Sequence, residues 1–160
     1  MLVPAILYKD QIIKEFQKYY YTTDMMYETG CMDNWTPEIE ECSDECTFQF
    51  AIVDDNTNKL IGYLGYRVDW YVSRVYNFGL FSFDRKNIRI GKDVFNKLDE
   101  LITRFHRVEW RAVGGNPACR GYDSFIKRHG GNKHILKDAL KDKNGTYHDD
   151  IIYEIVRSDN

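Results

Sequence analysis

Hydrophobic and polar positions change their period near residue 83. From 75 to 83 they alternate, with aromatic residues on both faces, which is typical of an interior strand covered on each side. From 94 to 105 apolar residues recur at helical spacing and form one stripe: Val94, Leu98, Leu101, Ile102 and Phe105. Four basic residues lie around the junction: Arg85, Lys86, Arg89 and Lys92. We predict a strand, a basic turn closed by Gly91, and an amphipathic helix whose N-terminus is suited to phosphate.

The first half of the chain predicts one helix and three further strands. Residues 2–8 are expected to form a short strand that tolerates Pro4 at an edge, and Asp10 is expected to be the N-cap of a helix. The pattern weakens from 21 to 47, which makes this segment a candidate lid. Residues 48–55 and 59–69 flank a turn rich in Asp and Asn, so with the strand at 75 they predict an antiparallel meander.

The second half predicts a crossover and a closing hairpin. Residues 107–113 alternate and should pair in parallel with the strand before the amphipathic helix. A further helix is expected after this strand, with Asn116 as N-cap, Pro117 at the first position and Gly130 and Gly131 at its end. Asn144-Gly145 then predicts a turn between two antiparallel strands, 133–140 and 147–157.

Composition and charge limit the class of protein. The chain of 160 residues is one domain of ordinary size, with neither a secretion signal nor a bilayer-spanning run, so we expect a cytoplasmic protein with no membrane partner. The cysteines match no zinc spacing, and we expect no metal and reduced thiols, leaving the role of three of them open: Cys31, Cys42 and Cys46. The net charge of −3 and the absence of a known motif argue against nucleic acid.

The charges are unevenly distributed along the chain. Between residues 19 and 58 there are ten acidic residues and no Lys or Arg. Two interpretations stand side by side: contact with partners of opposite sign at two regions, or ordinary solvated faces.

The order of these elements resembles the Gcn5-related N-acetyltransferase (GNAT) superfamily over nearly the whole chain. Residues 81–98 are similar to the acetyl-CoA turn and helix of the family, 116–131 to its late Asn-led helix, and 136–155 to its closing hairpin. The resemblance implies an α+β (α/β) fold with a mixed, mostly antiparallel central sheet of about seven strands, flanked by helices, in which strands four and five are a parallel pair. It also implies a single domain over residues 1–160.

The resemblance implies acetyl-CoA as cosubstrate and assigns a binding site to it. Backbone contacts are expected from the fourth strand, and phosphate contacts from the turn and the start of the helix, with Asn116 as a further contact. The residues are Leu80, Phe81, Ser82, Lys86, Asn87, Ile88, Arg89, Ile90, Gly91 and Lys92. Of the usual glycines of the turn only Gly91 is present, so Arg89 either points away or supplies its charge to the phosphates. Gly79 fits a bulge, a close backbone approach or simple packing.

The resemblance also identifies Tyr122 as the candidate catalytic proton donor. The family places this Tyr seven residues after the Asn, whereas Tyr122 follows Asn116 by six, and Tyr122 also fits the apolar stripe of its helix. Where many relatives carry Glu on the fourth strand this chain has Asn77, so the general base is left open between three acids: Glu28, Asp33 and Glu109.

These features predict an N-acetyltransferase acting on a primary amine. The acidic, aromatic-rich segment after the first helix favours a cationic acceptor such as a polyamine, an aminoglycoside or a basic peptide terminus. The alternative is a non-catalytic acyl-CoA-binding or protein-interaction module on the same fold. As to assembly, both a monomer and a homodimer through the closing hairpin are compatible with the sequence.

Overall fold

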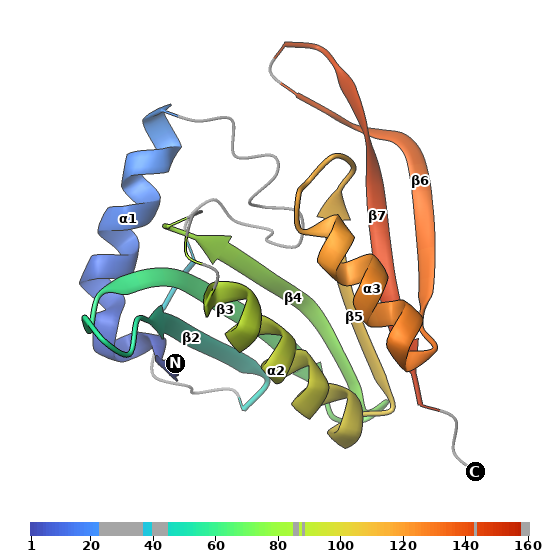
Figure 1. Ribbon diagram of the computed structural model, residues 1–160, viewed down its shortest axis with the longest axis horizontal. Coiled ribbons are helices and arrows are strands. Elements are labelled where there is room, and N and C mark those ends of the chain that lie inside the picture. The colour runs from blue at the N-terminus through green and yellow to red at the C-terminus, as the bar shows by residue number, and fades with distance from the viewer. Residues whose placement is uncertain (23–36, 40–44, 85–86, 88, 143, 158–160) are drawn as a thin grey trace.

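A seven-stranded sheet with helices on both faces forms the protein (Figure 1). The computed structural model describes residues 1–22, 37–39, 45–84, 87, 89–142 and 144–157. The strands are β1 (Leu2–Pro4), β2 (Thr47–Val53), β3 (Leu60–Asp69), β4 (Arg74–Ser82), β5 (Arg107–Val113), β6 (Asn132–Lys141) and β7 (Tyr147–Val156). The helices are η1 (Ala5–Tyr8), α1 (Lys9–Thr22), α2 (Arg89–Arg104) and α3 (Cys119–His129). None of the helices in this part of the chain is long and apolar enough to cross a membrane.

The strand order is β1-β2-β3-β4-β5-β7-β6, and β4 and β5 are the parallel pair. The other neighbouring strands are antiparallel. The predicted α+β fold with a mixed sheet is therefore confirmed, including the parallel fourth and fifth strands. The crossover through α2 carries the chain from β4 to β5, as the strand–helix–strand order requires.

Two clusters of buried side chains lie on opposite faces of the sheet. The larger cluster joins the stripes of α2 and α3 to β3, β4, β5 and β7, and Val94, Leu98, Trp110 and Phe125 belong to it. The smaller cluster packs Ile12 and Phe16 of α1 against β2, β3 and β4. Consecutive residues such as Ala51 and Ile52 enter different clusters, which shows that β2 is covered on both sides.

Several predicted boundaries are wrong near prolines and turns. The first strand ends at Pro4 rather than at residue 8, and Ala5–Tyr8 form a 3₁₀ turn that runs directly into α1. Because α1 continues this turn from Lys9, Asp10 lies in its first turn and is not the N-cap. The third helix begins at Cys119 rather than Pro117. Asn116 instead accepts a hydrogen bond from the Ala118 N–H at 2.9 Å and closes the preceding turn.

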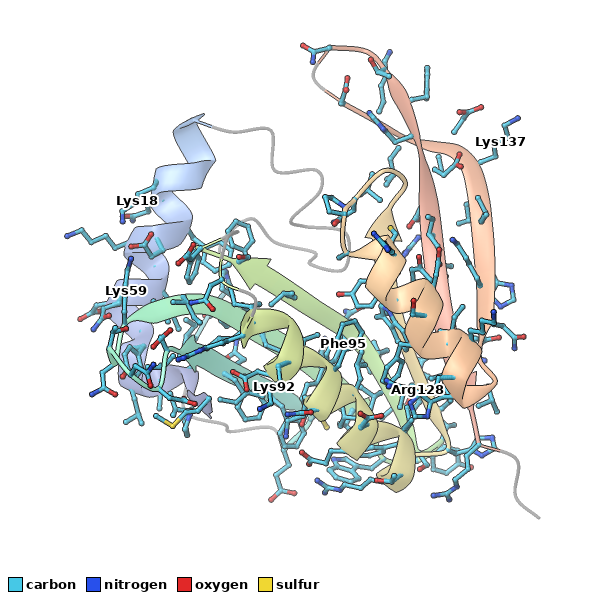
Figure 2. The ribbon with its side chains drawn as sticks, viewed as in Figure 1. Lys18, Lys59, Lys92, Phe95, Arg128 and Lys137 are labelled. Atoms are coloured by element: carbon cyan, nitrogen blue, oxygen red, sulfur yellow. The ribbon has the colours of Figure 1, made fainter. Side chains whose placement is uncertain are left out.

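The closing hairpin is present, and its outer strand is interrupted. The register of β6 on β7 shifts between Leu136 and Leu140, where Asp138 has a φ of 52°. This bulge bends the strand in the middle of its exposed edge, where Lys137 points away from the sheet (Figure 2). A bulge and an outward lysine are two of the devices by which proteins protect an open edge.

Candidate functional site

The parallel pairing of β4 and β5 stops half-way along the two strands. Three residue pairs are in register, Arg74 with Arg107, Val75 with Val108 and Phe78 with Trp110. Beyond Phe78, β4 continues to Ser82 and remains paired with β3, while β5 continues to Val113 and remains paired with β7. The two strands diverge in this region (Figure 1). Residues 79–82 of β4 therefore have no ladder partner on β5, and an extended ligand can take that place.

A bulge at Asn77 begins the divergence. Asn77 has a φ of 50°, and the register of β4 on β3 shifts between Gly65 and Arg67 opposite it. The bulge suggested at Gly79 is thus two residues too late, because Gly79 pairs regularly with Gly65. Asn tolerates this left-handed conformation better than most residues, so Asn77 suits the bulge. Its side chain carries no carboxylate that could act as a base.

Two helix N-termini lie at the diverging end. Both α2 and α3 follow strands that run in parallel, so both begin at the same end of the sheet. One turn into each helix they touch, since a Cβ on Gly121 would lie 2.8 Å from Phe95 Cζ. Phe95 lies between the two helices (Figure 2). The two helices therefore pack against each other close to their N-termini.

The predicted basic turn is described only in part, because Arg85, Lys86 and Ile88 lie outside the described residues. Asn87 accepts a hydrogen bond from the Arg89 N–H through its Oδ1 at 3.1 Å. The helix starts at Arg89, so Gly91 lies within the first turn, and a Cβ there would meet no atom of the described residues within 4 Å. The Ile90 N–H donates to the Asn87 carbonyl at 3.4 Å, so Asn87 occupies the first two N–H groups of the helix.

The guanidinium of Arg89 is paired with the β2–β3 turn. Its Nη1 lies 3.2 Å from Oδ1 of Asp54. The same oxygen accepts hydrogen bonds from the N–H groups of Asn56 and Thr57, and the other oxygen of Asp54 accepts one from the Asn87 side chain. The Asn56 N–H is the main cause that holds the pKa of Asp54 below its ordinary value. No sequence pattern links a turn at residue 54 to a helix start at residue 89, and this contact was missed.

Two buried polar atoms facing α2 and α3 have no hydrogen-bond partner among the described residues. They are Nε1 of Trp110, whose side chain is 1 % exposed, and Oγ of Ser82. A buried donor without an acceptor costs ~1–3 kcal/mol, and buried Trp N–H groups usually find one. Trp110 belongs to the last registered pair of β4 and β5, and Ser82 ends β4. The diverging strands are therefore bounded at both ends by unsatisfied polar groups.

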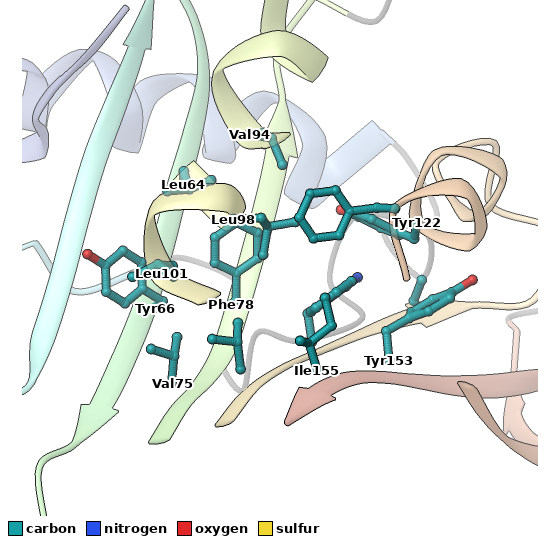
Figure 3. Close-up of a cluster of buried hydrophobic side chains, with 14 of the residues drawn as sticks. Leu64, Tyr66, Val75, Phe78, Val94, Leu98, Leu101, Tyr122, Tyr153 and Ile155 are labelled. Atoms are coloured by element: carbon teal, nitrogen blue, oxygen red, sulfur yellow. The ribbon is translucent and has the colours of Figure 1, made fainter. Parts of the chain in front are cut away.

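Tyr122 is packed among aromatic rings. It is 7 % exposed and lies edge-on to Phe95 and Trp110, with ring centroids 5.9 and 5.7 Å away, and 5.4 Å from the ring of Tyr153. Figure 3 shows it extending from α3 toward the side chains of α2. The ring thus belongs to the apolar stripe, and it also lies beside Trp110 at the point where the strands separate.

Only one of the three candidate bases lies among the described residues. Glu28 and Asp33 lie outside the described residues, and Glu109 is bound to Arg107 at 2.9 Å and faces Arg74 at 3.8 Å. The sequence did not identify the two carboxylates that the sheet buries, Asp150 and Glu154. They lie on the face away from α3, since the alternate residues of β7 pack against that helix.

These two buried carboxylates are both paired with arginine. Asp150 pairs with Arg111, and Glu154 with Arg107 at 2.6 Å. Glu154 also accepts from His134 at 2.9 Å, and this hydrogen bond is the main cause that lowers its pKa. Neither carboxylate is poised as a free base.

Comparison with solved structures shows that the chain has the fold of GNAT acetyltransferases. A probable acetyltransferase of this family from Chromobacterium violaceum superimposes with a TM-score of 0.61 at 17% identity over 98% of this chain and 85% of that one. Another probable acetyltransferase gives 0.55 at 17% identity over 97% and 73%. Spermidine/spermine N-acetyltransferase SpeG from Vibrio cholerae, in a complex with manganese ions, gives 0.56 at 19% identity over 71% and 67%. No family model and no curated protein matches the sequence.

The described residues are compatible with acetyl-CoA, the cosubstrate that the family resemblance implies. The unpaired stretch of β4 leaves backbone groups for an extended pantetheine arm, and the start of α2 carries the exposed cationic side chains of Arg89 and Lys92, which suit phosphate. Ser82 Oγ and Trp110 Nε1, which are buried without a hydrogen-bond partner among the described residues, add side-chain donors beside this stretch of β4. No group of three or more His, Cys, Asp or Glu side chains that could hold a metal ion occurs in the part of the chain that the structure describes.

Proposed function

We propose that the protein is an acetyl-CoA-dependent N-acetyltransferase whose acceptor is a primary amine. The observation that carries this proposal is the interrupted β4–β5 ladder, with a helix N-terminus at its open end. Such an opening accepts an extended chain with a phosphate at one end and a reactive group at the other. The acetyltransferase neighbours support this choice of ligand among those that an open ladder can bind.

In this proposal the cosubstrate is held by two groups of residues. Residues of β4 bind the pantetheine arm through the backbone: Leu80, Phe81 and Ser82. The turn and the start of α2 bind the phosphates: Lys86, Asn87, Ile88, Arg89, Ile90, Gly91 and Lys92. Ile90 is 5 % exposed and its N–H donates to the Asn87 carbonyl, so its share is to hold the start of α2 in place, whereas Lys92 is exposed and supplies charge. Asn116 holds the turn before α3.

When bound, acetyl-CoA supplies an activated acetyl thioester. The acceptor nitrogen forms the new C–N bond as the C–S bond breaks; the amine gives up one proton, and the departing thiolate takes one. Backbone N–H groups of β4 beyond the bulge stabilise the negative charge that develops on the carbonyl oxygen. Tyr122 is the proposed proton donor to the thiolate, from its place beside the strand separation. The amine proton leaves through water to an acid of the segment after α1.

The acceptor is proposed to be cationic. Most of the acidic residues that favour a cation lie outside the described residues, and Glu38 and Glu45 are exposed. Two others belong elsewhere: Asp54 pairs with Arg89, and Asp55 lies 2.9 Å from the Met1 ammonium group. The remaining acidic and aromatic segment supports an amine with more than one positive charge. SpeG, which acts on spermidine and spermine by its name, is consistent with such an acceptor.

Turnover of an amine panel tests this function. Thiol release from acetyl-CoA is followed with spermidine, an aminoglycoside, a basic peptide and a neutral primary amine at low salt. We expect release with the polycationic amines, and a fall in kcat of about 10²-fold in Tyr122→Phe, the lower value for a positioned acid. Tyr71→Phe is the matched control, because Tyr71 is 97 % exposed on the β3–β4 turn.

A non-catalytic acyl-CoA-binding module is the second candidate. Two observations favour it: Asn77 stands where a carboxylate is expected, and Tyr122 is packed among rings. Calorimetry with CoA separates the candidates. Binding without thiol release on every amine would support the module, and failure to bind CoA would exclude both.

A further inference from the structure

Trp110 carries a polar group that the fold leaves without use. Its indole ring stacks on Tyr153 at 5.6 Å and lies edge-on to Tyr122 and Phe125, so its carbon atoms are packed as in any aromatic core. Its Nε1 atom is buried and has no hydrogen-bond partner among the described residues. A phenylalanine would fill the same core without this unsatisfied donor, so the nitrogen calls for a separate explanation.

The position of Trp110 in the sheet suggests which kind of group its indole N–H binds. Trp110 and Phe78 are the last pair in register before β4 and β5 separate. Both side chains belong to the cluster under α2 and α3. Along β4 from this point, Leu80 packs against the same cluster and Ser82 ends the strand with the second unsatisfied group on this face. The two donors thus mark the two ends of one unpaired stretch of strand.

We propose that the Trp110 indole N–H donates a hydrogen bond to an oxygen of the acyl-pantetheine arm, and that the Ser82 hydroxyl binds the same arm nearer α2. This inference rests on the proposed function, and it names two side chains that bind the cosubstrate. Pantetheine is an extended chain with two amide groups, so beside the apolar side chains of this cluster it needs hydrogen-bond donors. The indole N–H is uncharged at every working pH, so it donates a hydrogen bond without exchanging a proton with the acceptor amine.

The competing explanation is an N–H contact with the face of the Tyr122 ring. The two rings are 5.7 Å apart at 62°, which is compatible with such a contact. In that case the nitrogen is satisfied within the core, and a ligand between the strands leaves it unchanged. The two explanations therefore differ in whether the indole N–H responds to pantetheine.

The indole proton of Trp110 gives a direct readout. In a ¹⁵N-labelled full-length protein the Trp indole resonance that is lost in Trp110→Phe is assigned to Trp110. We expect it to move downfield on addition of CoA and of pantetheine, and to stay in place with adenosine 3′,5′-bisphosphate, which lacks the arm. The indole of Trp70, which donates to the Glu45 carbonyl at 3.0 Å and is 54 % exposed, serves as the internal control and should not shift with pantetheine.

Affinity provides the second measurement. Trp110→Phe should weaken CoA binding about 3- to 10-fold in calorimetry, the worth of one hydrogen bond, and Trp70→Phe should leave it unchanged. If CoA binds the wild type while the Trp110 indole does not respond, the inference is wrong and the proposed function stands. If the wild type does not bind CoA, both fail. Should Trp110→Phe fold poorly, the wild-type indole shift decides alone, with its assignment taken from backbone-linked spectra.

Discussion

The ion pair of Arg89 and Asp54 predicts a measurable competition for phosphate. The guanidinium is 45 % exposed and lies 3.2 Å from the carboxylate, so Arg89 must leave Asp54 before it can contact a phosphate of CoA. Replacing Asp54 by Asn keeps an acceptor for the N–H groups of the turn and removes the charge that holds Arg89. CoA binding should therefore tighten in Asp54→Asn.

The size of this effect follows from the nature of the pair. Exposed ion pairs in double-mutant cycles are coupled by an amount that corresponds to about 2- to 5-fold in an equilibrium constant. We expect Asp54→Asn to lower the Kd for CoA by this factor and Arg89→Ala to raise it about 10-fold. Both effects should shrink as salt is raised toward 0.5 M, because the Arg89 side chain is exposed.

A double-mutant cycle measured by calorimetry isolates the competition. In the Arg89→Ala background there is no guanidinium to release, so adding Asp54→Asn should change the Kd by less than about 2-fold. An equal gain in both backgrounds would mean that Asp54 acts on CoA by simple charge repulsion. Unchanged binding in Arg89→Ala would show that Arg89 only tethers the β2–β3 turn to α2, and the phosphate role would be abandoned.

Two further predictions concern stability, both measured by urea unfolding. Gly121→Ala should destabilise the protein by about 1 kcal/mol, because overpacking against Phe95 (~1–3 kcal/mol) exceeds the gain in helix propensity. Gly91→Ala, whose Cβ would meet no described atom within 4 Å, should instead stabilise the protein by up to ~1 kcal/mol. Equal effects of the two substitutions would disprove the close contact between Gly121 and Phe95. Glu154 has a pKa below its ordinary value of 4.5 in the folded state, so its stabilisation is complete above pH 4.5 and is lost as the pH falls through the lower folded value. Glu154→Gln should therefore cost roughly 1.5–3 kcal/mol at pH 7 and flatten the loss of stability in acid, while an unchanged acid profile would count against the pairing with His134.

The sheet and its parallel pair could be predicted because they depend on local signals. Alternation gave the strands, the stripe of residues 94–105 gave α2, and Asn144-Gly145 gave the last turn. Errors occurred where the signal was a single residue. Pro4 ends the first strand instead of sitting within it, and Asn116 caps a turn one step ahead of α3 instead of the helix itself.

The candidate site was predictable in outline only. The family resemblance pointed to the fourth strand and the start of α2, but side-chain partners across the sheet depend on register, which the sequence does not encode locally. Arg89 illustrates this limit, since its partner Asp54 lies 35 residues earlier in the chain. Trp110 lies in the alternating segment 107–113, whereas its buried nitrogen without a partner became visible only when the surrounding rings were in place.

The three registered pairs between β4 and β5 also bear on how the molecule unfolds. They join a part made of β1–β4 and α1 to a part made of β5, β7, β6 and α3, with α2 packed across the junction. A short ladder makes this junction a natural place for the native state to open first in hydrogen exchange. A ligand that fills the unpaired stretch supplies the missing length of ladder. Its binding would therefore tie the two parts into one cooperative unit as well as place a reactive group.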